Sequence, residues 1–224
     1  MQLNCIIKFL SLMVHQILTA KDLSFRYKNG TALTFPEIEI NKGQHTLLLG
    51  DSGSGKTTLL QLLGGLSLPS TGSVLLNGQS LYDLKGSKLD AFRAQHIGFI
   101  FQEAHLLKNL TLLENIKIAQ SLAKLPVNEN AILTMLEQLQ LSDRTKSYPN
   151  QLSRGQLQRA AIARALINTP SLLIADEPTA ALDDTNTARV MELLLSIADQ
   201  YGSTLLIATH DKRIKDRFHH TYNL

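Results

Sequence analysis

The sequence has a single cysteine and no hydrophobic run long enough to cross a bilayer. The lone Cys5 among 224 residues excludes an internal disulfide framework, which favours a reducing compartment. No Cys/His spacing predicts a zinc site. The apolar stretch Phe9–Ala20 is shorter than the roughly 20 residues of a transmembrane helix, so we expect another chain to supply any membrane part. The net charge of +3 is small and scattered, and we expect no nucleic-acid partner.

Residues 1–15 also lack the basic start and the small-residue cleavage site of a signal peptide. The apolar run within them fits a strand, a short surface helix or a weak signal-like segment. We interpret residues 1–15 as a dispensable N-terminal extension, with Met13 as an alternative start of translation. Residues 16–224 are then long enough for a single domain with one sizeable core.

A complete phosphate-binding pattern, G-x-x-x-x-G-K-S/T, follows the apolar run Thr46–Leu49. Its glycines let the backbone curl so that successive N–H groups point inward, and the helix that follows adds its positive N-terminal end. Lys56 is expected to reach the terminal phosphates, and the Thr57 hydroxyl to bind Mg²⁺. The candidate nucleotide-binding residues here are Gly50, Asp51, Ser52, Gly53, Ser54, Gly55, Lys56, Thr57 and Thr58.

The remaining hydrophobic pattern predicts an α/β domain with a mainly parallel sheet. Alternation between Gln16 and Ile40 predicts a small antiparallel sheet, in which Pro36 indicates an edge strand. Helical spacing from Leu106 to Leu141, interrupted at Pro126, predicts two helices. The other expected elements are strands at Thr46–Leu49, Val74–Leu76, His96–Phe101, Leu172–Ala175 and Thr204–Thr209, and helices at Thr58–Leu63, Gln156–Ile167 and Thr187–Tyr201.

Three polar residues, Gln102, Asp176 and His210, each follow an expected strand. The carboxyl ends of parallel strands meet at one edge of a sheet, so these side chains are expected to share that edge. We expect Asp176 to lie beside the phosphate-loop strand and to serve Mg²⁺; the alternative for Asp176 and Glu177 is a turn with two solvated acids. Tyr27 fits either an adenine-stacking ring or an ordinary half-buried strand aromatic, and local pattern alone favours the second.

The segment Leu152–Gln156 resembles the L-S-G-G-Q signature of ATP-binding-cassette ATPases, and it stands ahead of the pair Asp176-Glu177 in that family's order. The resemblance implies a P-loop NTPase core with a helical subdomain at about 104–165. It implies adenine stacking for Tyr27. The other implied roles are Mg²⁺ contact for Gln102, general base for Glu177, a seam-crossing loop for residues 180–183, γ-phosphate contact for His210, and nucleotide contact for Ser153, Gly155 and Gln156.

The resemblance also implies a working assembly. Two copies would enclose two ATP with Mg²⁺ and power a separate integral-membrane permease from the cytoplasmic face of the membrane. Arg93 to Gln102 resembles the subgroup of lipoprotein-releasing, macrolide-export and cell-division complexes; the alternative is an ATP-gated regulatory module without transport. The sequence predicts neither the substrate nor the direction of transport. Arg154 replaces the first signature glycine, and we expect activity to survive because Ser153 and Gly155 remain.

Overall fold

The computed structural model describes residues 16–28, 30–180 and 182–224, and it contains two five-stranded sheets. The expected N-terminal extension lies outside these residues. The first sheet is antiparallel and orders its strands β2-β1-β5-β6, with β3 also paired to β1. Its strands are β1 (Gln16–Arg26), β2 (Ala32–Thr34), β3 (Ile38–Asn41), β5 (Thr71–Leu76) and β6 (Gln79–Ser80).

The second sheet is parallel throughout and has the order β10-β4-β9-β8-β7. Its strands are β4 (Thr46–Leu49), β7 (Ile97–Ile100), β8 (Leu172–Asp176), β9 (Thr204–Thr209) and β10 (His220–Asn223). The predicted α/β class with a mainly parallel core sheet is therefore confirmed. One expectation is wrong: β9 lies between β4 and β8, so Asp176 does not sit beside the phosphate-loop strand.

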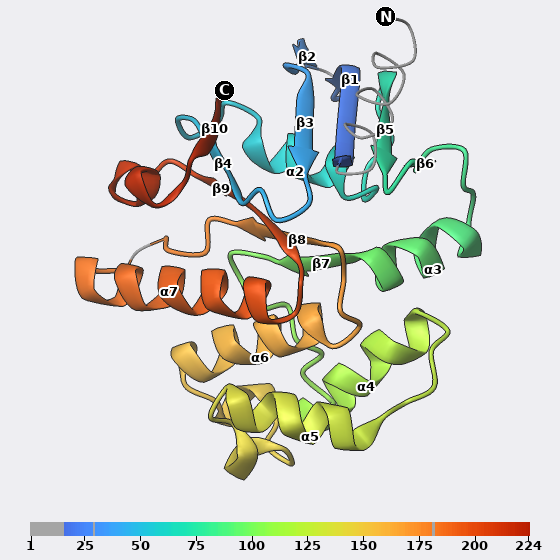
Figure 1. The fold of residues 1–224 in the computed structure, drawn as a ribbon. Helices are drawn as coiled ribbons and strands as arrows, with labels where there is room; N and C mark the ends of the chain where they lie inside the picture. Colours follow the sequence, from blue (N-terminus) through green and yellow to red (C-terminus); the bar gives the residue numbers. More distant parts are fainter. Residues whose placement is uncertain (1–15, 29, 181) are drawn as a thin grey trace, which may run out of the picture.

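Helices cover both faces of the parallel sheet (Figure 1). Helix α2 lies between this sheet and the antiparallel strands, and α4, α5, α6 and α7 lie on the opposite side. Their bounds are α2 (Lys56–Leu63), α3 (Ser87–His96), α4 (Leu112–Leu122), α5 (Glu129–Gln138), α6 (Arg154–Leu166) and α7 (Asp184–Gln200), with short 3₁₀ turns η1 (Ser142–Arg144), η2 (Pro149–Gln151) and η3 (Lys212–Arg217).

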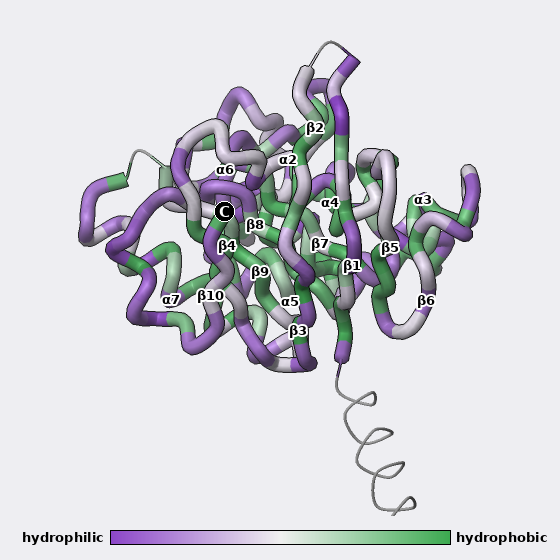
Figure 2. The backbone as a smooth tube through the Cα atoms, turned by 90° about the horizontal axis from the view of Figure 1, so that it is seen from above, coloured by the Kyte–Doolittle hydropathy of each residue, from purple (hydrophilic) through white to green (hydrophobic). Residues whose placement is uncertain are grey.

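The central strands are buried on both faces because successive side chains enter different cores. In β9, Leu206 and Ala208 join the core that contains α2, whereas Leu205 and Ile207 join the core that contains α4 to α7. Hydrophobic residues accordingly follow these strands, and hydrophilic residues gather in the outer loops (Figure 2). This double burial explains why the strands are uninterrupted apolar runs.

Several local predictions differ from the structure. Pro36 lies between β2 and β3 rather than in an edge strand, because the expected strand is divided there. Residues 16–26 form one continuous strand, β1, which pairs with three neighbours. Among the described residues, no helix is long and apolar enough to cross a membrane.

Candidate nucleotide site

The phosphate loop joins β4 to α2 and bends where glycine permits it. Gly53 and Gly55 have φ of 84° and 97°, in the left-handed region that favours glycine. A Cβ on Gly55 would also lie 3.3 Å from the Phe35 ring. Within the described residues, no side chain caps the start of α2, so its first N–H groups remain available to an anion. The loop therefore has the form of a phosphate cradle.

Lys56, the first residue of α2, is buried and points back across this loop. Its Nζ donates to the carbonyl oxygens of Gly50 and Asp51, at 2.9 Å each. The same Nζ lies 3.6 Å from Oε1 of Glu177. The cation of the loop and the carboxylate at the end of β8 thus face each other.

Glu177 is held by residues from two other elements. Thr209 donates its hydroxyl to Oε2 at 2.8 Å, and Nδ1 of His210 lies 2.9 Å from Oε1. The Glu177 side chain is 14% exposed, whereas that of His210 is 53% exposed. The structure therefore brings Lys56, Glu177 and His210 together. Thr209 was not predicted, although it directly precedes His210 at the end of a buried strand.

Asp176 offers an oxygen for a hard cation. It is buried, and its Oδ1 has no hydrogen-bond partner among the described residues. Burial raises the pKa of this carboxyl, and the nearby Thr57 hydroxyl acts in the opposite direction. A buried carboxylate oxygen and a threonine hydroxyl are the ligand types that Mg²⁺ takes, so these residues fit the ion. Gln102 is exposed and follows β7, the strand adjacent to β8.

Tyr27 lies just beyond β1 and reaches toward the start of α2. Its hydroxyl is 2.6 Å from Oγ1 of Thr58, and its ring meets Phe25 edge to face at a centroid distance of 4.8 Å. The side chain remains 53% exposed. The ring is thus held at its polar end while about half of the residue stays exposed, which suits stacking of a planar ligand.

The signature-like segment lies at the start of α6 and faces solvent. Ser153 caps the helix through a reciprocal pair with Gln156: the Gln156 N–H donates to the serine hydroxyl at 3.3 Å, and the Ser153 N–H donates to the glutamine side chain at 2.9 Å. A Cβ on Gly155 would meet open space. Among the described residues, neither Ser153 nor Gly155 hydrogen-bonds to the phosphate loop. The structure does not bring this segment to the loop of its own chain.

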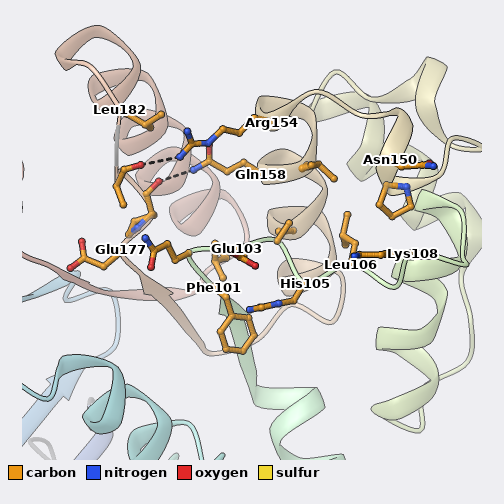
Figure 3. A pocket seen from close by; sticks show the side chains of 18 residues that line it. Phe101, Glu103, His105, Leu106, Lys108, Asn150, Arg154, Gln158, Glu177 and Leu182 are labelled. Carbon is orange, nitrogen blue, oxygen red and sulfur yellow. Dashed lines mark hydrogen bonds between the residues drawn. The ribbon is translucent and has the colours of Figure 1, made fainter. Parts of the chain in front are cut away.

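A cleft of about 930 Å³ lies between the segment that follows β7, helix α6 and the loop that begins at Glu177 (Figure 3). Glu177 stands at one end of the view, and Lys108 and Asn150 lie at the other. Gln102 and Arg154 also line the cleft. No residue of the phosphate loop lines this cleft.

The parallel sheet with a phosphate loop, an acidic strand end and a signature-like helix defines a P-loop nucleoside triphosphatase. The profile of the family described as ABC transporter matches residues 34–180. The chain therefore belongs to the ABC transporter family, and it is an ATP-binding ATPase of that family. The expected fold, a P-loop NTPase core with an antiparallel β part and helices, is confirmed.

Several individual proteins are similar to this chain over most of its length. The chain is 41% identical over 189 residues to the lipoprotein-releasing system ATP-binding protein LolD of Bacteroides fragilis, a match covering 82% of this chain and 88% of the relative. LolD of Legionella pneumophila is 40% identical over 207 residues, covering 90% and 91%. The ATP-binding cassette MJ0796, in a dimeric post-hydrolysis state bound to ADP and Pi, superposes with a TM-score of 0.81 at 32% identity and covers 93% of this chain and 94% of its own.

Proposed function

We propose that this ATPase pairs with a second copy of itself around two ATP and powers a separate membrane permease from the cytoplasmic face. Relatives at about two-fifths identity are named as ATP-binding proteins of a lipoprotein-releasing system, which favours a lipoprotein over the peptide or macrolide-like compound that the subgroup also allows. The dimeric state of the structural neighbour MJ0796 supports the pairing. The observation that carries the enzymatic part is the set of contacts around Glu177.

Glu177 is the general base in this proposal. Its carboxylate accepts a hydrogen bond from Thr209 and lies against His210 and Lys56, so it is held in a fixed orientation. In that state it can take a proton from an attacking water. His210 is exposed enough to reach the γ-phosphate, and Lys56 offsets the charge that develops there.

Two further parts of the chain hold the nucleotide. The phosphate-loop N–H groups bind the phosphates, and Tyr27 stacks on the adenine. Thr57, Asp176 and Gln102 would hold Mg²⁺, which when bound acts as a Lewis acid on the phosphoryl oxygens. Ser153, Gly155 and Gln156 of a second copy close the site from the other side, which fits the exposure of Ser153 and Gly155 at the start of α6.

A groove of about 490 Å³ offers the permease a place to dock. Apolar side chains from β7 and α4 form its walls, including Phe99, Ile118 and Leu122, and Arg93 and Arg164 add charge. Leu122 is 61% exposed and lies beside the other apolar side chains of the groove, so it adds to one apolar surface. Phe101, next to Gln102, belongs to both this groove and the cleft described above. A cytoplasmic segment of the permease bound here would sense the position of Gln102.

The test compares the purified protein with Glu177→Gln, and with Glu103→Gln as the matched control. Glu103 is an exposed acid of the same cleft, so it controls for the loss of charge. We expect Glu177→Gln to lower ATP hydrolysis by at least roughly a hundredfold, because a general base contributes that much. ATP binding should persist, and size-exclusion chromatography in ATP should show a stable dimer.

Hydrolysis by Glu177→Gln at the wild-type rate would remove Glu177 from this role. Co-purification of the wild-type protein with an integral membrane protein tests the permease. A membrane partner whose activity is switched by ATP without movement of a substrate would identify the regulatory alternative instead.

A further inference from the structure

The loop that follows Glu177 is tied to its own chain at three backbone carbonyls. Gln158 donates to the Pro178 oxygen at 2.8 Å, and a guanidinium nitrogen of Arg154 donates to the Ala180 oxygen at 3.2 Å. Arg213 donates to the Leu182 oxygen at 3.3 Å. Figure 3 shows the first two contacts as dashed lines from α6 to the loop. Two arginines from different elements therefore hold the segment between Glu177 and α7.

Arg154 differs from the other two donors in its position at the very start of α6. It is the first residue of α6 and follows Ser153, the cap of that helix. Its side chain leaves the signature-like segment and ends on the loop that carries Glu177. A glycine at this position, as in the signature that the segment resembles, has no side chain to make such a contact.

The contact leads directly to Glu177. The Ala180 N–H donates to the Glu177 carbonyl oxygen at 3.2 Å, so the residue held by Arg154 also closes the turn that begins at Glu177. Glu177 itself has φ of 48°, in the left-handed region that is rare for glutamate. A conformation of this kind persists only where the surroundings fix it, and the tie at Ala180 is one such restraint.

We propose that Arg154 is a positioning residue that links the signature segment to the loop of Glu177 within one protomer. The proposal rests on the proposed role of Glu177 as general base. The start of α6 serves the nucleotide bound by the second copy, whereas Glu177 serves the nucleotide bound by its own chain. When the start of α6 contacts the nucleotide bound by the second copy, Arg154 restrains Glu177, which acts on the nucleotide bound by its own chain. The two nucleotide sites of a dimer are therefore coupled inside each protomer.

The test uses Arg154→Met, which keeps the apolar stem and the helix propensity but removes the donors. Arg154→Lys keeps a cationic donor in a different geometry. Arg159→Met is the matched control, since Arg159 lies on the same helix and donates to the Leu139 oxygen at 3.1 Å, away from the loop.

Two measurements are made on each variant. Hydrogen exchange of the peptide covering residues 177–183, without nucleotide, reports the tie itself. Steady-state hydrolysis gives kcat and KM for ATP. We expect Arg154→Met to speed exchange several-fold and to lower kcat about three- to tenfold with KM unchanged, since one charge-assisted hydrogen bond is lost and the phosphate loop is untouched. Arg154→Lys should recover part of both, and Arg159→Met should change neither.

An unchanged rate of hydrogen exchange in Arg154→Met would show that Arg154 does not hold the loop at Ala180. Faster exchange with an unchanged or higher kcat would overturn the positioning role, as would equal effects of the methionine and lysine variants. The exchange experiment needs no ATP and no permease, so its result stands apart from the general-base assignment, which is decided by Glu177→Gln.

Discussion

At the scale of the residue, Glu177 is fixed by its backbone as well as by its side chain. Its N–H donates to the Ala208 carbonyl at 2.8 Å, which ties the turn after β8 to β9. The left-handed φ then turns the carboxylate toward Thr209 and Lys56. A glutamate without these contacts would take a commoner backbone conformation and lose its direction. The geometry around the carboxylate is thus a property of β9 and α2 as much as of Glu177.

Thr209→Val tests whether β9 orients the Glu177 carboxylate. The substitution keeps the shape of the side chain and removes the hydroxyl that donates to Glu177. We expect kcat to fall about tenfold, because loss of one hydrogen bond to a charged group removes roughly 1.5 kcal/mol of orientation. KM for ATP should stay constant in steady-state assays.

Thr204→Val is the control for Thr209→Val. Thr204 lies at the other end of β9, is equally buried, and accepts a hydrogen bond from the Gly43 N–H at 2.8 Å. Its loss should lower stability without changing kcat. A wild-type kcat in Thr209→Val, or an equal fall in both variants, would contradict a specific role for the Thr209 hydroxyl.

At the scale of the element, α4 is anchored by a buried polar side chain. Asn115 is 2% exposed and makes four hydrogen bonds to the backbone between Leu107 and Thr111. These include an N–H and three carbonyl oxygens, so one side chain orders the segment that leads from Gln102 into the helix. Periodicity marks the apolar face of a helix, and it does not show that an amide on that face holds a loop.

Asn115→Leu should destabilise the protein by about 2–4 kcal/mol, because it removes four hydrogen bonds made by a buried side chain and leaves the Leu107 N–H without its acceptor. The measurement is urea denaturation followed by circular dichroism. Asn130→Leu on α5 makes the same chemical change at an exposed position and should shift stability by less than about 0.5 kcal/mol. Similar midpoints for the two variants would show that Asn115 does not anchor this segment.

The elements that sequence patterns missed share a physical cause. Helix α3 contains no fully buried residue, and its apolar contact with the core comes from the partly buried Leu89 and Phe92, so its hydrophobic stripe is short. Strand β10 is short and has no buried residue, and it exists because its backbone pairs with β4. The buried strands and α2 were predicted because burial on both faces requires apolar runs. The order of those strands was not, since no local pattern encodes the insertion of β9 between β4 and β8.

In the candidate site, too, some features could be predicted from local sequence patterns and others could not. Residues at or directly after the carboxyl end of a strand, such as Asp176 and His210, could be predicted because strand ends converge on one edge of a parallel sheet. The contacts of Thr209 and Arg154 could not, because each depends on how distant segments meet across that edge. Arg154 appeared in the sequence only as a departure from a signature, and its partner is a backbone oxygen that no sequence pattern reveals.

At the scale of the whole molecule, the residues proposed to bind and hydrolyse ATP form two groups that lie in different parts of the structure. Lys56, Glu177 and His210 meet at the carboxyl edge of the parallel sheet, whereas Ser153 and Gly155 face solvent at the start of α6. If a second copy completes each site, then two chains with defects in different halves must restore one intact site between them. This consequence is specific to a shared site, because a site complete in one chain cannot be repaired by another.

Mixing Lys56→Met protein with Gly155→Glu protein makes the test. Gly155 has open space around its Cβ position, and an acid in the first turn of a helix is favourable, so Gly155→Glu should fold. Its carboxylate would repel the γ-phosphate. Each parent should be nearly inactive alone, and the mixture should hydrolyse ATP well above either parent. A chain with both substitutions, mixed with Lys56→Met protein, forms no intact site and should stay inactive. Activity no higher in the first mixture than in this control would contradict a nucleotide site shared between two copies.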